Sequence, residues 1–286
     1  MKPAPFDYAS PSTVDEALGL LADHGGSARV LAGGQSLLPQ MALRQVRPRL
    51  LVDVNRVAGL STRSTTDGGA RLGATVRQAA VLHAGSGTGL LDAALPWVGS
   101  PGTRSRGTVV GSLCFADPAA ELPTVLLAVG GGLEVRSAAG SRTVEAAELY
   151  RGPGRTALAP DELAVAATFP LDADDTRSAW LEFGRRPGDL PLVGVGVVAR
   201  VRDGVVDAVR VACAGVHDVP WAVPVAGLRG AGGGLAREVA EVAARECRPV
   251  DDHRTTAAHR RVLVRTLVRR ALEQVLRSDT EVIGAA

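Results

Sequence analysis

The sequence predicts an α+β fold, because three kinds of pattern follow one another along the chain. A short α/β part comes first, a mixed part rich in glycine turns follows, and a β-hairpin with two helices closes the chain. The pattern changes near residues 57 and 175, so we expect three parts: residues 1–57, 58–175 and 176–286. With 286 residues, 46% of them hydrophobic, the chain can bury a sizeable core.

The first part alternates between helix and strand patterns. Ser12 is expected to cap an amphipathic helix that runs through Leu21, because acidic residues occupy the first turn. The apolar segments 29–32 and 50–54 are typical of short buried strands. Between them, a short helix is expected from Ser36, directly after a pair of glycines.

The second and third parts carry clearer turn signals. In the second part we expect a hairpin that turns at residues 66–69, helices at 75–82 and 124–130, and strands at 133–136 and 161–169. In the third part, Asp203-Gly204 lies between two alternating apolar runs, which strongly indicates a hairpin. Helices are expected at residues 235–245 and 259–277, where apolar residues recur at helical spacing.

Composition excludes several classes of function. The formal net charge is +2, from 32 basic and 30 acidic residues, which gives no electrostatic case for binding nucleic acid. No apolar run reaches the roughly 18 residues of a membrane span, and the first residues do not form a signal peptide. Cys114, Cys213 and Cys247 match no metal or iron–sulfur pattern, and their odd number argues against a disulfide framework. We therefore expect the protein to be located in a reducing cytoplasm and to bind no metal.

A first candidate site follows the predicted strand at residues 29–32. Gly33 and Gly34 permit positive φ and have no Cβ, so backbone N–H groups can converge there on a phosphate oxygen. The following helix and the Ser36 hydroxyl would add to such a site. The segment is neither a Walker A loop nor GxGxxG. Taken alone, the glycines favour a tight turn between a strand and a helix.

A second candidate site spans residues 107–123, which combine small residues, hydroxyls and two carboxylates. Thr108 and Ser112 are candidates to hydrogen-bond a phosphate or a polyol chain. Glu121 is a candidate to accept from a ring N–H or a sugar hydroxyl. Asp117 precedes a proline, so it is equally well explained as the cap of a helix that begins with that proline.

Three further segments carry weaker signals. Residues 194–199 fit the GxGxxA form of the dinucleotide fingerprint, but a strand and a hairpin follow where that motif needs a helix, so we discount it. Arg185 and Arg186 lie beside a turn and would face a cofactor, a phosphate, a partner subunit or only solvent. The arginines of residues 260–270 spread around their predicted helix, which favours a solvated or subunit-facing helix over a nucleic-acid reader.

Together, three segments resemble the flavin-binding medium subunit of the xanthine dehydrogenase and aerobic carbon monoxide dehydrogenase family. They are AGGQSLLP at residues 32–39, GTVVGSLCFADPAAELP at 107–123 and EFGRRPGDLPLVGVGVVARV at 182–201. The resemblance covers nearly the whole chain. It implies an FAD-binding unit of two subdomains, of the type shared with vanillyl-alcohol oxidases (the PCMH type). A C-terminal domain with a small antiparallel sheet and helices would follow.

The resemblance also implies a cofactor site. Residues 32–36 would wrap the FAD pyrophosphate, and residues 108–112 would form the facing wall. Glu121 falls where the family has an Asp that contacts the flavin, Asp117 matches the family's Ala-Asp-Pro aspartate, and Leu163 falls near a strand whose backbone meets the adenine or flavin side. The implied cofactor-binding residues are Ala32, Gly33, Gly34, Gln35, Ser36, Thr108, Gly111, Ser112, Asp117, Glu121 and Leu163.

Two departures from the family pattern concern the same site. Val110 replaces the first glycine of the usual pair, and we expect its Cβ to narrow the approach to phosphate. Glu121 is one methylene longer than the usual Asp.

The family's chemistry divides between subunits. The molybdenum subunit oxidises the substrate, electrons cross iron–sulfur clusters to FAD, and the flavin reduces an external acceptor. The resemblance therefore implies noncovalent FAD and a hetero-oligomer with a molybdopterin-binding large subunit and a 2Fe-2S small subunit. Two alternatives stay open: a free-standing FAD oxidoreductase of the same fold, and a non-enzymatic scaffold that has lost FAD, which Val110 favours.

Overall fold

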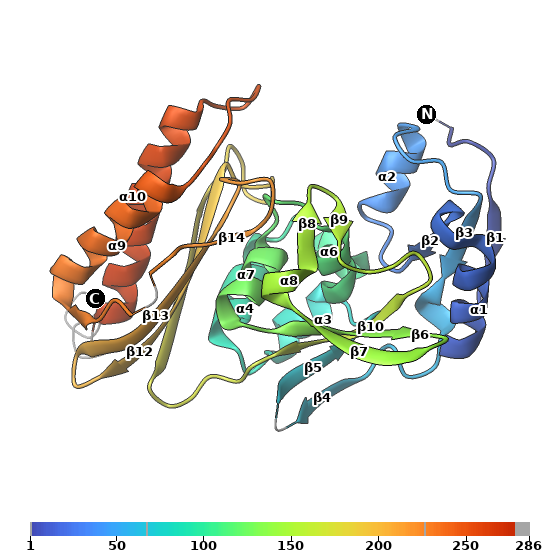
Figure 1. Cartoon of the computed structure of the whole chain (residues 1–286), viewed down its shortest axis with the longest axis horizontal. Helices are drawn as coiled ribbons and strands as arrows, with labels where there is room; N and C mark the ends of the chain where they lie inside the picture. Colours follow the sequence, from blue (N-terminus) through green and yellow to red (C-terminus); the bar gives the residue numbers. More distant parts are fainter. Residues whose placement is uncertain (1, 67, 226, 278–286) are drawn as a thin grey trace. The chain divides into compact units, whose positions relative to one another are not determined.

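The computed structural model describes residues 2–66, 68–225 and 227–277, and the chain divides into two compact units (Figure 1). Unit 1 comprises residues 1–84, 100–116 and 131–169, and unit 2 comprises residues 85–99, 117–130 and 170–286. Each unit thus combines segments that are far apart in the sequence. The predicted α+β class is confirmed. The three-part division near residues 57 and 175 stays a prediction.

A three-stranded parallel sheet forms one part of unit 1, in the order β1-β3-β2. Its strands are β1 (Asp7–Ala9), β2 (Ala28–Leu31) and β3 (Leu50–Asp53), and its helices are α1 (Val14–His24) and α2 (Leu37–Ala42). Because the strands are parallel, the carboxyl ends of β2 and β3 lie at the same edge. The loop of residues 32–36 and the short 3-10 helix η2 (Val54–Arg56) begin there.

The start of α1 differs from the prediction by one residue. Thr13 is the N-cap, and its Oγ1 accepts a hydrogen bond from the Glu16 N–H at 3.2 Å. Ser12 instead donates from its backbone N–H to the Glu16 carboxylate at 2.7 Å. Ser12 and Thr13 thus each make one of the two hydrogen bonds of a capping box. The sequence alone does not decide which of the two hydroxyls caps the helix.

A five-stranded antiparallel sheet forms the other part of unit 1, in the order β4-β5-β10-β6-β7. Its strands are β4 (Arg63–Thr66), β5 (Gly69–Gly73), β6 (Gly132–Ser137), β7 (Gly140–Glu145) and β10 (Leu163–Phe169). The accompanying elements are α3 (Gln78–Ala84), α5 (Pro101–Arg106), α6 (Val109–Phe115), α8 (Ala146–Leu149), β8 (Tyr150–Gly152) and β9 (Arg155–Thr156). The helix predicted at 75–82 begins only at Gln78, because the N–H groups of Ala74 and Thr75 still bond to Val165 and Leu60.

Unit 2 is built on an antiparallel sheet in the order β11-β12-β13-β14, with β15 beside β13. The strands are β11 (Thr176–Phe183), β12 (Val193–Arg202), β13 (Val205–Ala214), β14 (Trp221–Ala222) and β15 (Gly230–Ala231). Asp203 and Gly204, at the predicted hairpin turn, have φ of 50° and 75°. Positive φ at both positions is what the tightest hairpin turn requires.

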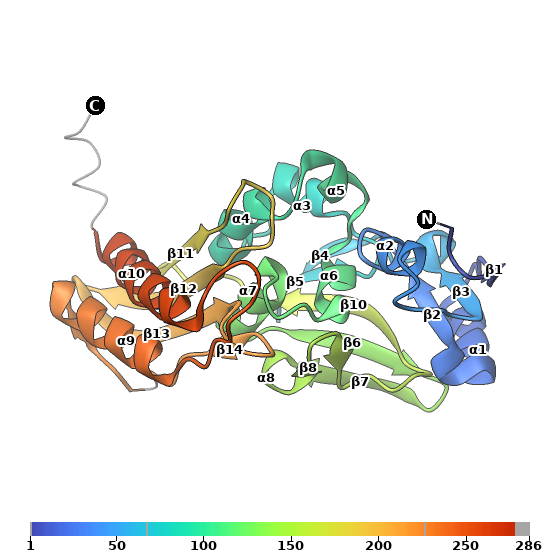
Figure 2. The ribbon, with the colours of Figure 1, turned by 90° about the horizontal axis from the view of Figure 1, so that it is seen from above.

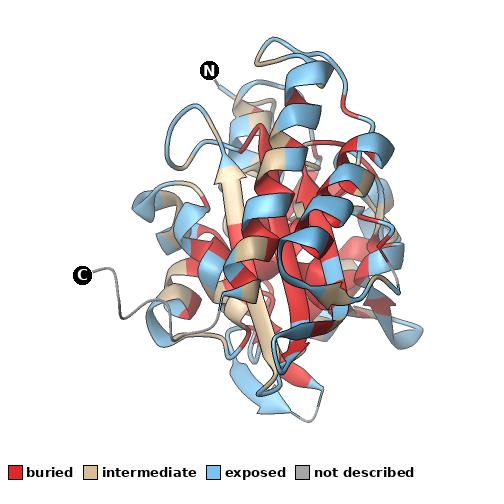
Figure 3. Cartoon of the chain, turned by 90° about the vertical axis from the view of Figure 1, so that its left-hand side faces the viewer, coloured by how far each residue is buried: buried red, intermediate tan, exposed pale blue. Residues whose placement is uncertain are grey.

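Helices cover both faces of this sheet. They are α9 (Gly232–Glu246) and α10 (Ala257–Leu276) on one face, and α4 (Gly89–Ala94) and α7 (Glu121–Val129) on the other. Figure 2 shows α9 and α10 side by side, and Figure 3 shows that their outer surfaces are exposed while the strands beneath are mostly buried or intermediate. Residues 193–199 of β12 are therefore buried on both faces, which explains their continuous apolar run.

The glycines of the discounted dinucleotide motif have a packing role. They lie on β12, as the strand prediction requires. A Cβ added at Gly194 would lie 2.9 Å from Cζ2 of Trp180, and one at Gly196 would lie 3.1 Å from Cδ2 of Leu90. The glycines thus make room for an indole ring and a helix.

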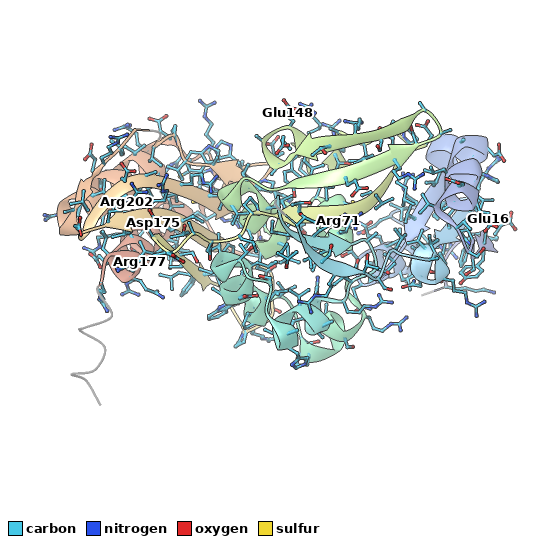
Figure 4. The ribbon with its side chains drawn as sticks, turned by 90° about the horizontal axis from the view of Figure 1, so that it is seen from below. Glu16, Arg71, Glu148, Asp175, Arg177 and Arg202 are labelled. Atoms are coloured by element: carbon cyan, nitrogen blue, oxygen red, sulfur yellow. The ribbon has the colours of Figure 1, made fainter. Side chains whose placement is uncertain are left out.

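Ion pairs and hydrogen bonds fasten the ends of the unit 2 elements (Figure 4). Asp175 accepts from Nε of Arg202 at 2.7 Å, and Arg177 donates to the Arg277 carbonyl at 3.0 Å, beyond the last turn of α10. One arginine of α10 departs from the prediction of a solvated face: Arg260 is buried and pairs with Asp252 at 2.8 Å. None of the helices within the described ranges combines the length and apolar character of a membrane span.

Candidate cofactor-binding site

The two predicted loops of unit 1 are in direct contact. A Cβ added at Gly33 would lie 2.7 Å from the Arg106 carbonyl oxygen, 2.8 Å from Cα of Gly107 and 3.0 Å from the Thr108 nitrogen. Only glycine allows this approach, because the opposing atoms are backbone. Residue 33 therefore lies so close to the backbone of residues 106–108 that not even a methyl group fits between them.

The first loop presents unused backbone donors. Among the residues that the structure describes, the N–H groups of residues 33–36 donate to no acceptor. Gly34 adopts a φ of 72°, which reverses the chain between β2 and α2. The Ser36 hydroxyl makes no capping hydrogen bond although it precedes α2. Several unpaired N–H groups and a free hydroxyl in one turn are the kind of donor set that binds a phosphate, so this loop fits a diphosphate.

The second loop uses its polar groups differently. Oγ1 of Thr108 accepts from the Gly111 N–H at 3.0 Å and thereby caps α6, and the Thr108 side chain is buried. A Cβ at Gly111 would lie only 2.5 Å from that same oxygen, so the cap itself requires glycine. Ser112 is half-buried on α6 and keeps its hydroxyl available. Of the three residues predicted for this wall, Ser112 has the most freedom to contact a ligand.

Val110 does not narrow the approach to the loops, contrary to expectation. It lies on α6 with only 2% of its surface exposed, and it joins Val109 and Leu113 in the core. The helix turns this side chain inward, so the position tolerates a Cβ. The main argument for a scaffold that has lost FAD is therefore removed.

Asp117 and Glu121 lie in unit 2, and Asp117 does not cap a helix. Its Oδ1 accepts from the Ala119 N–H at 2.8 Å, and its carbonyl accepts from the Ala120 N–H at 3.1 Å, which defines a turn. The helix α7 begins only at Glu121, after Pro118. The predicted proline-initiated helix is thus replaced by a proline turn.

Among the predicted site residues, Glu121 has the most perturbed carboxyl. Only 3% of the residue is exposed, and burial raises the pKa of its carboxyl to about 8, with the charges of Glu182 and Asp117 adding to the rise. Burial also raises the pKa of Glu182 to about 7, although the Trp180 Nε1–H donates to it at 3.0 Å. At neutral pH Glu121 is therefore mostly protonated and can donate as well as accept. No pattern in the sequence predicts that the charge of Glu182 acts on Glu121.

The remaining predicted residues have less to offer. Leu163 begins β10 with its side chain buried, so only its backbone is available to a ligand. Arg185 and Arg186 lie on the exposed loop between β11 and β12, where with His253 and Arg254 they line a cavity of about 370 Å³. Within the described part of the chain, no three His, Cys, Asp or Glu side chains group as a metal site would require.

Two residues near the loops were not predicted from the sequence. Asn55 donates from Nδ2 to the Ala32 carbonyl at 2.8 Å, and Arg77 donates to the Arg106 carbonyl at 2.5 Å. Asn55 follows the predicted strand at 50–54, and polar residues at the carboxyl ends of parallel strands are where sites assemble. That signal was present in the sequence for Asn55, whereas nothing local marked Arg77.

Comparison with known proteins places these observations in context. Residues 4–172 match the family model for the FAD binding domain in molybdopterin dehydrogenase, and residues 178–275 match that for the CO dehydrogenase flavoprotein C-terminal domain. The chain is 36% identical to the nicotine 6-hydroxylase medium subunit of Paenarthrobacter nicotinovorans (95% of this chain, 98% of the relative). It is 31% identical to the carbon monoxide dehydrogenase medium chain of Hydrogenophaga pseudoflava (95% and 97%). A solved carbon monoxide dehydrogenase chain from that organism superimposes with a TM-score of 0.92 at 29% identity, covering 96% of this chain and 98% of the other.

Proposed function

The chain belongs to the family of FAD-binding domains of molybdopterin dehydrogenases, and from this premise we propose that it is the FAD-carrying subunit of a molybdenum hydroxylase complex. In this role it is an oxidoreductase subunit that receives electrons from iron–sulfur clusters and delivers them to an external acceptor. The observation that carries the proposal is the close contact between Gly33 and residues 106–108, in a loop whose N–H groups at residues 33–36 are unpaired.

The residues of the chain have separate tasks in this proposal. The N–H groups of residues 33–36, with the hydroxyls of Ser36 and Ser112, hold the diphosphate. Glu121, in unit 2, stays the predicted contact of the flavin, where its raised pKa keeps a proton on the carboxyl at neutral pH. FAD, when bound, supplies the ability to accept and release electrons. The protein positions it and needs no general base.

The partners follow from the same premise. Relatives of nearly the same length are medium subunits or chains, which function beside other subunits. We propose a molybdopterin-binding large subunit and a 2Fe-2S small subunit as partners in a hetero-oligomer. We also propose a cytoplasmic location, in keeping with three free cysteines, two of them buried.

Flavin content of the purified full chain tests the proposal. We expect one noncovalent FAD for each chain, released by acid and identified by chromatography and visible absorbance. A preparation that takes up no FAD, alone or with its partner subunits, contradicts the proposal and favours a scaffold. Substrate turnover by the FAD-loaded chain without partners would instead favour a free-standing oxidoreductase.

A further inference from the structure

The side chain of Asn55 joins β3 to the first loop. Its Nδ2 donates to the Ala32 carbonyl at 2.8 Å and to Oδ1 of Asp53 at 2.6 Å, and the same Oδ1 accepts from the Asn55 N–H at 2.9 Å. Asp53 is held in turn by the Tyr8 hydroxyl, which donates to its Oδ2 at 2.6 Å. The amide of Asn55 is therefore fixed from two sides.

The side chain of Arg77 continues this chain of hydrogen bonds to the second loop. Its Nη2 donates to Oδ1 of Asn55 and its Nη1 to the Arg106 carbonyl, each at 2.5 Å. The backbone beside Arg77 also holds the second loop, because the Gln78 N–H donates to Gly107 at 2.9 Å and the Val109 N–H to Val76 at 3.1 Å. Within the described residues, no hydrogen bond joins residues 32–36 directly to residues 106–112.

The orientation of the Asn55 amide is determined by its partners. Nδ2 faces a carbonyl and a carboxylate, whereas Oδ1 faces a guanidinium. A flipped amide would place an oxygen against two acceptors and an NH₂ group against a cation. Only one orientation of the amide satisfies all three partners, so the bridge has a single geometry.

From this geometry we propose that Asn55 and Arg77 form a clamp that sets the separation of the two loops and thereby the affinity for the diphosphate of FAD. The inference rests on the proposed function. Both residues are positioning residues, since their side-chain hydrogen bonds go to backbone carbonyls, to each other and to Asp53. Fixing the loops before binding reduces the ordering that the cofactor must otherwise impose. Removing the side chain of Asn55 or Arg77 leaves a loop carbonyl unpaired and allows the two loops to move apart.

Three single variants of the full chain test the clamp. Asn55→Leu keeps the branched shape and the number of side-chain heavy atoms and removes every hydrogen bond of the amide. Arg77→Lys keeps the charge but cannot bridge two acceptors in a planar fork. The control is Arg71→Lys, which breaks a comparable half-buried link, from Arg71 to Glu134 at 2.6 Å, within unit 1 and away from both loops.

We expect the FAD dissociation constant to rise about 10- to 100-fold in Asn55→Leu and Arg77→Lys, and to stay within about twofold in the control. ADP carries the diphosphate without a flavin. Its dissociation constant, measured by calorimetric titration of the apo chain, should rise by the same factor. The double variant should bind about as weakly as either single variant, because the two residues form one bridge. The midpoint temperature of thermal unfolding of the apo chain should fall by about the same amount in the clamp variants and the control.

Each contrary outcome is specific. Unchanged FAD affinity in both clamp variants, with wild-type protein that binds FAD, overturns the clamp but leaves the proposed function intact. Wild-type protein that binds no FAD overturns the proposed function itself. Loss in Asn55→Leu but not in Arg77→Lys overturns the two-residue clamp, because Asn55 then acts without the guanidinium bridge of Arg77. Loss for FAD without loss for ADP places the effect away from the diphosphate and also overturns the clamp. Should Asn55→Leu fail to fold, Asn55→Asp retains the acceptor for Arg77, removes the donor to Ala32 and is expected to weaken FAD and ADP alike.

Discussion

Gly33 shows at the scale of one residue why a small side chain is needed at this site. The atoms that an added Cβ would meet, at 2.7 to 3.0 Å, all belong to the backbone of residues 106–108 and cannot rotate away. A methyl group must therefore push the two loops apart. The family motif at this position thus has a steric cause that is visible in a single chain.

We expect Gly33→Ala to weaken FAD binding by about 10-fold or more, since overpacking of this size costs about 1–3 kcal/mol. Titration of the apo chain with FAD measures the effect. Gly19→Ala is the matched control, because a Cβ at Gly19, on α1 of the same unit, meets nothing within 4 Å. Equal FAD affinity in Gly33→Ala and the control would show that the loops do not enclose the cofactor.

Glu121 carries a pH dependence that follows from its burial. In the unfolded chain its carboxyl ionises near the ordinary value of 4.5, and in the folded chain at about 8. Between these values the folded state binds more protons, so this group's contribution to stability is complete below pH about 4.5 and is lost as the pH rises to about 8. Each unit of pKa difference corresponds to about 1.4 kcal/mol.

Glu121→Gln should remove this loss. The free energy of unfolding of the variant, relative to wild type, is expected to increase from pH 5 to pH 8 by a few kcal/mol and then to level off. Denaturant unfolding at a series of pH values measures it. A difference between the two proteins that stays constant with pH would mean that Glu121 is ionised in the folded chain.

At the scale of elements, β12 explains why a motif can mislead. Alternate residues face α9 and α10, while Gly194 and Gly196 face Trp180 and α4. A central strand covered on both faces needs small residues wherever a large ring lies across it. The glycine spacing resembles a dinucleotide fingerprint because Gly194 and Gly196 leave room for the Trp180 ring and for α4.

Gly194→Ala should destabilise the chain without changing its cofactor. The new methyl would meet the Trp180 ring at 2.9 Å and Cβ of Ala214 at 3.3 Å, so we expect a loss of about 1–3 kcal/mol in the free energy of unfolding. Gly233→Ala, in the open first turn of α9, is the control. The FAD content of the folded protein should equal that of wild type. A selective loss of FAD would indicate that residues 194–199 bind the cofactor.

At the scale of the whole molecule, the two units exchange segments of the chain. α4 and α7 belong to unit 2, although the strands before and after them in sequence belong to unit 1. The polypeptide passes between the units at residues 84, 99, 116, 130 and 169. Neither unit is a continuous stretch of sequence, so truncation at one boundary cannot isolate either of them.

Assembly with the two proposed partner subunits gives a testable prediction for the molecule as a whole. Co-expressed with its two partner subunits, the chain should purify in a stoichiometric complex, and substrate added without an acceptor should bleach its flavin absorbance. The isolated chain with FAD should show no bleaching, because we assign the substrate and the clusters to other subunits. Bleaching at the same rate in the isolated chain would contradict that division.

Local signals were sufficient for most elements. The Asp203-Gly204 hairpin, the strands at 29–32, 50–54 and 133–136 and the two C-terminal helices lie within a few residues of their predicted positions, because turn chemistry and apolar periodicity act locally. The errors lie where a distant partner decides. Ala74 and Thr75 form a turn in which their N–H groups bond to Val165 and Leu60, far along the chain, and Val110 is buried by its neighbours in unit 1.

The sequence by itself determined the fold class, both glycine loops and the family, since these depend on residue types in fixed order. Only the tertiary structure decided that Gly33 touches the Gly107 backbone, that Asn55 and Arg77 bridge the loops, and that Glu121 is buried. The physical reason is that hydrogen bonds, close backbone approach and desolvation depend on distances between segments. Such distances are fixed only when the whole chain packs.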